Sequence, residues 1–373
     1  MSLVDELLQQ PPYRRSACGN GHLFRAALRE SIAHHCTNCP PFHRWYHKHG
    51  LQPESEIEDV SSLPFLPSAV FKRLSLQSVS DGEVVRILRS SATSSGRPSR
   101  IALDAITRNR QMRSLAVLMN ALIGGRRPIV VLDAPPARTG GELPARVAGM
   151  RGYLMMASET HYVMETRDGA PALAIDHLHS TLQGFLERRA PVCLLGYTYI
   201  VHRYVVAPLL RLGSRYPLPA GSILLHFGGW KRLEEQAVDR AHFNADVEAV
   251  FGGRQLQIRD IYGFTEQLGI IYPDDGCGVR LVPAYSEVRV RDPFTLKLQP
   301  DGVPGLLQFI TPLPHSYPGV SLLLDDIGQI VSRDIGVDGR FGTRFEVLGR
   351  AKGAEIRGCG DTLPDPSLPG GLA

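Results

Sequence analysis

Residues 256–267 read LQIRDIYGFTEQ, a strand-like run that leads into a glycine turn. The side chains of this turn suit a nucleotide. Tyr262 can stack on a flat base, and Gly263 lets the backbone approach a ligand closely. Thr265 offers a hydroxyl to a phosphate, and Glu266 offers a carboxylate to Mg²⁺. The Thr-Glu pair could instead cap a helix, but the Tyr-Gly ahead of it favours the nucleotide-binding role.

A hydroxyl-rich loop lies nearer the N-terminus, where residues 88–100 read LRSSATSSGRPSR. Its hydroxyls can turn toward phosphate oxygens, and successive backbone N–H groups in such turns bind anions. Gly96 permits positive φ, while Arg97 and Arg100 add positive charge. No Gly-Lys-Ser/Thr follows at the spacing of a Walker loop. The loop is therefore either a solvated connection between two strands or a phosphate-binding loop of another kind.

Short apolar runs alternate with helical patterns through the middle of the chain. The runs are RRPIVVLDAPP (126–136), PVCLLGYTYI (191–200) and GSILLHFGG (221–229). Apolar residues recur at helical spacing in the segments between and after these runs, at 107–123, 177–189 and 231–252. Continuous apolar strands alternating with helices are typical of a buried parallel sheet. The expected fold class is therefore α/β.

The sequence pattern changes after about residue 280 to short β-like runs with frequent Pro and Gly. This pattern favours a small antiparallel sheet or barrel attached to the α/β core. We expect residues 1–82 to form a helical and extended region packed on the core, and 83–283 to form the α/β core itself. Residues 284–349 then form the β-rich subdomain, and 350–373 form a short C-terminal extension.

Composition excludes several classes of protein. The 373 residues are 43% hydrophobic and 21% charged, as in ordinary globular chains. The formal charge of +4 is dispersed rather than gathered in a stripe, which argues against nucleic acid. There is no apolar span of about 20 residues and no signal-peptide pattern at the start. We expect a cytoplasmic chain with no membrane partner.

The six cysteines are too sparse for a disulfide framework. Cys36 and Cys39 have the C-x₂-C spacing of a zinc site and lie within HHCTNCPPFHRWYHKH (34–49), which is rich in histidine. No second ligand pair is evident, although Cys18 and His22 are candidates. A helix connection is the alternative that we favour for this segment.

Five blocks in order resemble the adenylate-forming enzymes, which include acyl-CoA synthetases, luciferases and adenylation domains. They are the hydroxyl-rich loop, HFGGWKRL (226–233), IYGFTEQ (261–267), LLLDDIG (322–328) and LGRAKGAEIRGC (348–359). The loop looks like the phosphate-binding motif of these enzymes, YGFTE like their Tyr-Gly-x-Thr-Glu motif, and the Asp-Asp segment like their ribose-binding motif. The resemblance implies an adenylate-forming N-terminal domain, a small β-rich subdomain and a much reduced C-terminal domain.

Within that superfamily the chain is most similar to the acyl-protein synthetases of bacterial bioluminescence, subunits of a fatty acid reductase complex. LPFLPSAVFKRL (63–74), IALDAITRNRQ (101–111), HFGGWKRL and the segment EIRGC (355–359) carry this likeness over nearly the whole chain. Full-size adenylating enzymes have a further C-terminal domain, which supplies a lysine to the adenylation step. That lysine has no obvious counterpart here.

The resemblance assigns roles by position. The residues matched to ATP phosphates are Ser91, Thr93, Ser94, Ser95 and Gly96. The residues matched to the adenine and acyl pocket are Gly228, Gly229 and Trp230. The remaining nucleotide positions are Tyr262 and Gly263 at adenine, Thr265 at the α-phosphate, Glu266 at Mg²⁺, Asp326 at the ribose and Arg350 facing the nucleotide. Aromatic side chains that could shape the acyl pocket are Tyr197, Phe227 and Phe264. Ala92 departs from the glycine usual in this motif, so the loop is altered at that point.

The implied reaction joins a fatty or aryl carboxylate to AMP and then passes the acyl group to a thiol. Cys359 matches the cysteine that accepts the acyl group in bioluminescence synthetases and hands it to a reductase subunit. Arg357 beside it could favour the thiolate. An ordinary exposed thiol is the alternative. Two other functions stay open: a ligase that delivers the acyl group to coenzyme A or a carrier protein, and a non-catalytic nucleotide-binding subunit.

Overall fold

A six-stranded mixed sheet forms one half of the structure, and its strand order is β12-β11-β10-β9-β4-β6. The computed structural model describes residues 1–14, 21–89, 99–136, 143–167, 170–230, 237–252, 255–334 and 339–351. The five strands from β11 to β6 run parallel, and β12 closes the edge in antiparallel orientation. Their bounds are β4 Arg127–Val131, β6 Ala157–Tyr162, β9 Cys193–Tyr197, β10 Ile223–Phe227, β11 Gln257–Tyr262 and β12 Tyr272–Pro273.

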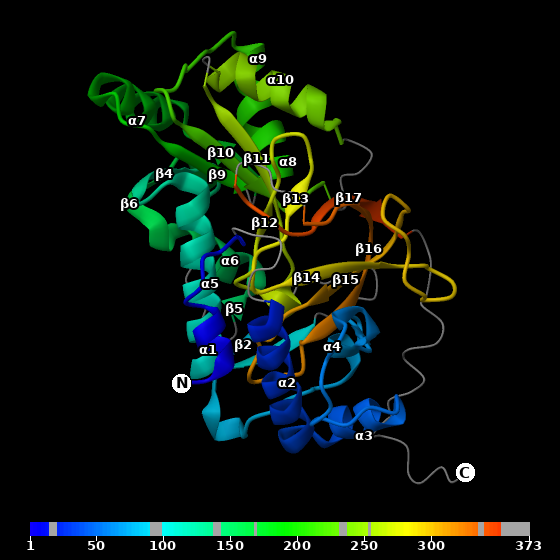
Figure 1. Cartoon of the computed structure of the whole chain (residues 1–373). Helices are drawn as coiled ribbons and strands as arrows, with labels where there is room; N and C mark the ends of the chain where they lie inside the picture. The colour runs from blue at the N-terminus through cyan, green and yellow to red at the C-terminus, as the bar shows by residue number, and fades with distance from the viewer. Residues whose placement is uncertain are drawn as a thin grey trace.

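The two central strands β9 and β10 are buried along their whole length, as in a sheet covered on both faces. The predicted parallel sheet is therefore confirmed. Helices pack around it in the upper part of Figure 1, where α7, α9 and α10 are seen. The helices of this half are α5 Ala105–Ile123, α6 Ala145–Tyr153, α7 Ile175–Arg188, α8 Thr198–Ile200, α9 Ala207–Arg211 and α10 Arg240–Phe251.

Helix α10 starts later than the sequence suggests. A helix was expected over 231–252, but it begins at Arg240, because the Asp239 side chain accepts a hydrogen bond from the His242 N–H and caps it. Residues 231–236 lie outside the described part of the chain. Between α8 and α9 the helix widens into a six-residue π-helical segment, Val201–Val206.

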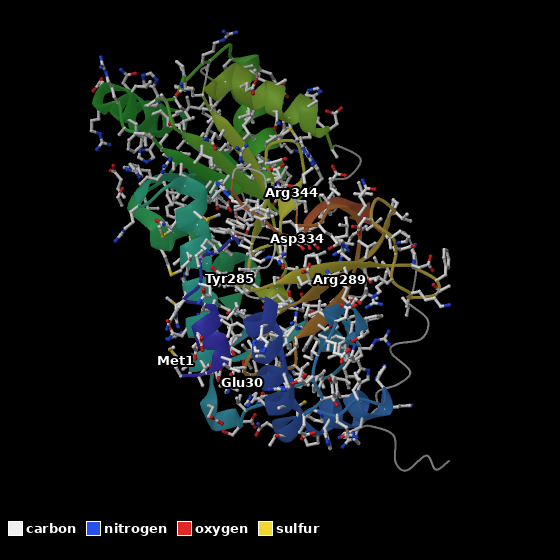
Figure 2. All side chains as sticks on the ribbon, viewed as in Figure 1. Met1, Glu30, Tyr285, Arg289, Asp334 and Arg344 are labelled. Atoms are coloured by element: carbon white, nitrogen blue, oxygen red, sulfur yellow. The ribbon has the colours of Figure 1, made fainter. Side chains whose placement is uncertain are left out.

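A second six-stranded sheet forms the β-rich half, as predicted. Its main path runs β13-β17-β16-β15-β14 in antiparallel order, and β1 pairs with β16 in parallel. The bounds are β1 Leu66–Pro67, β13 Arg280–Leu281, β14 Glu287–Arg291, β15 Gly305–Ile310, β16 Ser321–Ser332 and β17 Arg344–Arg350. Tyr285, labelled near the centre of the molecule in Figure 2, is fully buried beside this sheet.

The N-terminal region packs below this sheet in Figure 1, where α2, α3 and α4 are labelled. Its helices are α1 Leu3–Leu7, α2 Gly21–Asn38, α3 Pro40–Lys48 and α4 Val70–Arg73. Smaller sheets complete the fold. One has the order β3-β2-β5, from β2 Val84–Arg89, β3 Arg100–Asp104 and β5 Leu143–Pro144, and the other pairs β7 Met164–Arg167 with β8 Ala170–Leu173.

Strand pairing crosses two of the boundaries expected from the sequence. Strand β1, from the region placed in 1–82, pairs with β16, and β13, from the region placed in the core, pairs with β17. The division into four parts therefore stays a prediction. Within the described ranges, no helix combines the length and the apolar character that crossing a bilayer requires.

Candidate functional site

The carboxyl ends of three parallel strands lie side by side. Tyr197 ends β9, Phe227 ends β10 and Tyr262 ends β11, and the register pairs Phe227 with both Tyr197 and Ile261. The rings of Tyr197 and Phe227 meet edge to face with their centroids 4.4 Å apart. Ligands of open α/β sheets bind beyond the carboxyl ends of the strands. This edge is therefore the expected position of a ligand-binding site.

The turn after β10 depends on its glycines. Gly228 has φ +87° and Gly229 has φ +58°, conformations that L side chains rarely adopt. A Cβ built on Gly228 would lie 2.9 Å from Cδ1 of Tyr197, so a side chain would also clash there. Trp230 follows, half-buried, with its ring centroid 5.5 Å from that of His202. The backbone is thus exposed at the sheet edge where a ligand can contact it.

A carboxylate from the second sheet reaches this edge. The Tyr262 hydroxyl donates a hydrogen bond to Oδ2 of Asp326 at 2.6 Å. Asp326 lies on β16 in register with Arg350 at the end of β17, and Nε of Arg350 is 3.4 Å from Oδ1 of Asp326. Three residues that the family resemblance assigned to one nucleotide are therefore neighbours, although they come from two different sheets.

Burial dominates the ionisation of this pair. It raises the pKa of Asp326, although the hydrogen bond from Tyr262 and the charge of Arg350 act in the opposite direction. Burial and the neighbouring Asp326 carboxylate also raise the pKa of Tyr262 well above its usual value. The phenol therefore stays protonated and acts as a donor. One face of its ring lies against Phe309, with centroids 5.7 Å apart and planes at 24°.

Glu266 makes a separate set of contacts in the candidate site. Its carboxyl is buried, and burial raises its pKa. A hydrogen bond to the side chain of Ser99 and the charges of Lys72 and Arg350 act in the opposite direction. Its backbone carbonyl accepts a 2.7 Å hydrogen bond from the Tyr317 hydroxyl, which fixes the turn. A buried carboxylate facing two cations is suited to phosphate and metal chemistry.

The rest of the YGFTE turn is short and rigid. Thr265 opens a one-turn helix, Thr265–Gln267, and is half-buried. The Phe264 ring lies 5.0 Å from that of Phe309 and 6.2 Å from that of Tyr262. A Cβ on Gly263 would meet the Ile270 carbonyl oxygen at an ordinary 3.6 Å, so steric space alone does not require glycine there.

The middle of the hydroxyl-rich loop and the predicted acyl-accepting cysteine fall outside the described residues. Ser91, Thr93, Ser94, Ser95 and Gly96 lie outside the described part of the chain, and so does Cys359. The ends of the hydroxyl-rich loop are described. Arg89 and Arg100 face each other in the β2–β3 pair, and Ser99 is buried against Glu266. The ends of the loop therefore pair as a hairpin, and Ser99 lies at the candidate site.

The cysteine-histidine segment lies elsewhere, on α2 and at the start of α3. Burial raises the pKa of the Cys36 thiol to about 12 and also raises that of Cys39. Both ring nitrogens of His35 already have partners, the Ser78 hydroxyl at 2.8 Å and the Pro314 carbonyl at 3.2 Å. Zinc binds thiolates, so these surroundings favour the helix connection over the zinc site for Cys36 and Cys39.

Sequence reasoning missed two members of the site. Lys72 lies within the quoted segment 63–74, but no spacing rule pointed from it to Glu266, nearly 200 positions away. Ser99 was counted as a loop hydroxyl and not as a partner of that carboxyl. A signal was present in both cases: a lone lysine in an apolar segment, and a serine directly before a strand.

Comparison with known families gives a match over nearly the whole chain. The family described as "Acyl-protein synthetase, LuxE" matches residues 1–366. A long-chain-fatty-acid–luciferin-component ligase of Vibrio harveyi is 28% identical over 307 residues, 81% of this chain and 78% of that protein. The protein of the same name from Aliivibrio fischeri is 25% identical over 311 residues, with the same shares covered.

Solved structures match the fold. A 2-hydroxyisobutyryl-CoA ligase in the postadenylation state superposes with a TM-score of 0.65 at 15% identity, over 90% of this chain and 69% of its own. An open conformation of that ligase with an acyl-adenylate and CoA gives 0.64 at 16% identity, over 90% and 77%. At this identity the likeness establishes the architecture of adenylate-forming ligases and does not extend to individual residues.

Proposed function

Since the chain belongs to the LuxE acyl-protein synthetase family and is an adenylate-forming ligase, we propose that it activates a long-chain fatty acid with ATP and transfers the acyl group to a thiol. The observation that carries the site assignment is the convergence of Tyr262, Asp326, Glu266 and Arg350 at the carboxyl edge of the parallel sheet. The fatty acid is the substrate named for the two bacterial relatives.

The nucleotide is proposed to lie across the junction of the two sheets. Asp326 binds the ribose hydroxyls, because each carboxylate oxygen accepts more than one hydrogen bond and keeps an acceptor position beside its contact to Tyr262 or Arg350. The Tyr262 ring and the glycine turn at Gly228 and Gly229 flank the adenine. Arg350 faces the phosphates from the other side of Asp326. This arrangement leaves Trp230, Tyr197, Phe227 and Phe264 to border the base and the acyl chain.

The first step makes a mixed anhydride. A carboxylate oxygen of the fatty acid attacks the α-phosphorus of ATP, the bond to the β-phosphate oxygen breaks, and pyrophosphate leaves. Charge builds up on the phosphate oxygens, and Thr265 and the hydroxyls of Thr93, Ser94 and Ser95 are proposed to donate to them. Glu266 is an oxygen donor of the type that holds Mg²⁺, which supplies charge neutralisation when it is bound.

Lys72 is proposed as the positive charge that accompanies this step. Its charge acts on Glu266 from α4. An ammonium beside the metal carboxylate counters the phosphate charge that develops as pyrophosphate departs. Its role is electrostatic, so arginine at this position should keep part of the activity.

The second step is proposed to load the acyl group on Cys359. The thiolate sulfur attacks the acyl carbon, the bond to the AMP oxygen breaks, and AMP leaves with its electron pair. The thioester is then open to a reductase subunit that takes the acyl group onward. Cys359 lies outside the described residues, so its assignment rests on the family resemblance of EIRGC.

Two measurements on the full chain test this function. Acid-dependent ATP–pyrophosphate exchange, run with fatty and aryl acids, should be greatest with a long-chain fatty acid. A gel of protein incubated with ATP and labelled acid should show acyl-protein that Cys359→Ser abolishes, while exchange continues. Cys277→Ser is the matched control, because Cys277 is an exposed thiol in the described chain.

Each alternative has its own result. Product that forms only when coenzyme A or a carrier protein is added, with no labelled protein, would make this a ligase with an external acceptor. Absence of exchange with every acid, in protein that still binds ATP, would leave a nucleotide-binding subunit without catalysis. Labelling that survives in Cys359→Ser would move the acceptor to another side chain.

A further inference from the structure

Three side chains of types that bind metals meet between α10 and the π-helical segment Val201–Val206, and none of them is assigned to ATP. Nε2 of His202 is 2.9 Å from Oδ2 of Asp246, and Nε2 of His242 is 3.3 Å from the same oxygen. One ligand atom from each residue lies within 4.8 Å of the other two. Two imidazoles and a carboxylate thus point at one small volume.

The cluster joins two separate helices. His242 and Asp246 are one turn apart on α10, so they share a face of that helix. His202 comes from the π-helical segment Val201–Val206, which interrupts the run from α8 to α9. Single π turns inside α-helices are rare and frequently lie at functional sites. The widened turn therefore supplies the one ligand that α10 cannot provide for itself.

The geometry suits a divalent transition metal. Ligands about 2.0–2.2 Å from zinc lie roughly 3.3 Å apart when they are tetrahedral, and the two contacts to Asp246 are 2.9 and 3.3 Å. His202 and Asp246 are largely buried, with side chains 14% and 22% exposed, whereas His242 is 60% exposed. Two ligands are thus held firmly while the third faces solvent, which leaves an entry path and room for water as a further ligand.

We propose that His202, His242 and Asp246 form a Zn²⁺ site that clamps α10 to the helical run 198–211. Without metal, the Nε2–H of His202 donates a hydrogen bond to Asp246, and Nε2 of His242 lies 3.3 Å from the same oxygen. With zinc bound, both Nε2 atoms and the carboxylate bond the metal, and each imidazole keeps its proton on Nδ1. The site is separate from the Mg²⁺ assigned to Glu266, and its existence does not depend on the proposed reaction.

The clamp lies close to the turn proposed to border the nucleotide. The Trp230 ring is 5.5 Å from that of His202, and the Phe243 ring on α10 is 4.5 Å from that of His226, the residue before Phe227. Zinc at the clamp should therefore stiffen the helices behind the end of β10. It also places the metal near one of only two tryptophans in the chain, which provides an optical signal.

Direct binding of Zn²⁺ to the full chain tests the proposal. Calorimetry on metal-free protein should give one site, and zinc at 100 times its dissociation constant should raise the melting temperature by about 3 °C. His242→Ala and Asp246→Asn should each weaken binding by more than about 100-fold, because even losing an outer partner of a ligand costs 10- to 100-fold. His177→Ala, which removes an exposed histidine from α7, should bind as the parent does.

A spectroscopic measurement keeps the test independent of folding. Ni²⁺ should quench the fluorescence of Trp230 in the parent chain and in His177→Ala, but not in His242→Ala. Exposed His242 can be replaced without opening the core, and circular dichroism checks this. Zinc binding that persists unchanged in both ligand variants, no zinc binding at all, or a Co²⁺ spectrum with thiolate charge-transfer bands would each overturn the site.

Discussion

Tyr262 and Asp326 lie 64 positions apart in the sequence and share a 2.6 Å hydrogen bond. The bond joins the last residue of β11, in the parallel sheet, to the middle of β16, in the antiparallel sheet. It therefore fixes the relative position of the two sheets at the place where the nucleotide is proposed to bind. The same contact contributes to stability and sets the ribose-binding carboxylate in position.

Removing the hydroxyl of Tyr262 should show that this contact serves both stability and nucleotide binding. We expect Tyr262→Phe to lower the free energy of unfolding by about 1.5–3 kcal/mol, the range for hydrogen bonds to charged groups. The ring remains, so stacking on adenine is kept. Asp326→Ala should raise the KM for ATP about 10- to 100-fold, because the ribose loses its acceptor. Denaturant unfolding of both variants and the double variant gives the coupling energy, and strictly additive losses would contradict a direct bond.

Glu266→Gln should separate stability from activity. Burial raises the pKa of this carboxyl, so ionising it costs more in the folded chain than in the unfolded one. That cost is present above the folded pKa and disappears as the pH falls below the ordinary value near 4.5. The Glu266→Gln variant should therefore have a melting temperature no lower than that of the parent at neutral pH. Its rate of pyrophosphate exchange should fall by more than about 100-fold. Glu248→Gln, on the exposed face of α10, is the control, and a clear loss of melting temperature in Glu266→Gln would refute this reasoning.

How far the sequence predicted this site depends on the kind of contact. The motif that contains Tyr262 and Glu266 is continuous and follows one strand, so local pattern is enough to predict both residues. The apolar runs at 191–200 and 221–229 predicted the buried strands β9 and β10 because a sheet covered on both faces needs uninterrupted hydrophobic residues. Local pattern was enough in these cases.

Contacts between distant elements were beyond local pattern. The charge of Lys72 acts on Glu266 because β1 pairs with β16 and brings α4 to the sheet junction. The start of α10 was misplaced because helical periodicity continues through 231–239, whereas the cap at Asp239 decides where the helix begins. The pairing of Asp326 with Arg350 needed the register of β16 on β17.

Lys72 offers a comparison with its own neighbour. Lys72→Ala should lower the rate of pyrophosphate exchange about 10- to 100-fold, since its charge acts on the proposed metal carboxylate. Arg73→Ala removes an equal charge one position along, where the side chain is exposed, and should leave the rate within about twofold. Lys72→Arg should recover part of the loss. Equal losses in Lys72→Ala and Arg73→Ala would show that only the general charge of α4 matters.

Gly228 and Gly229 form a matched pair for backbone strain. Both have positive φ, but only at Gly228 would a Cβ strike the ring of Tyr197, at 2.9 Å, whereas nothing lies within 4 Å at Gly229. Gly229→Ala should therefore cost only the strain, about 1–2 kcal/mol. Gly228→Ala should cost more and should also weaken acid or ATP binding by displacing Tyr197. Denaturant midpoints and KM values check both, and equal effects would remove the steric argument.

His226 should make stability depend on pH between 4 and 6.5. Burial lowers its pKa to about 4, against a smaller opposing effect of Asp260. The folded chain therefore keeps the ring neutral where the unfolded chain would protonate it. The free energy of unfolding is therefore unaffected by the titration of His226 above its ordinary pKa of 6.5. It falls by about 3 kcal/mol in all as the pH drops toward 4. Nδ1 lies 3.0 Å from the Thr198 hydroxyl, a contact that asparagine can imitate. His226→Asn should flatten the dependence of the unfolding free energy on pH over this range. His177→Asn, on the surface of α7, is the control and should leave that dependence unchanged. An unchanged slope in His226→Asn would show that another buried group is responsible for the pH dependence.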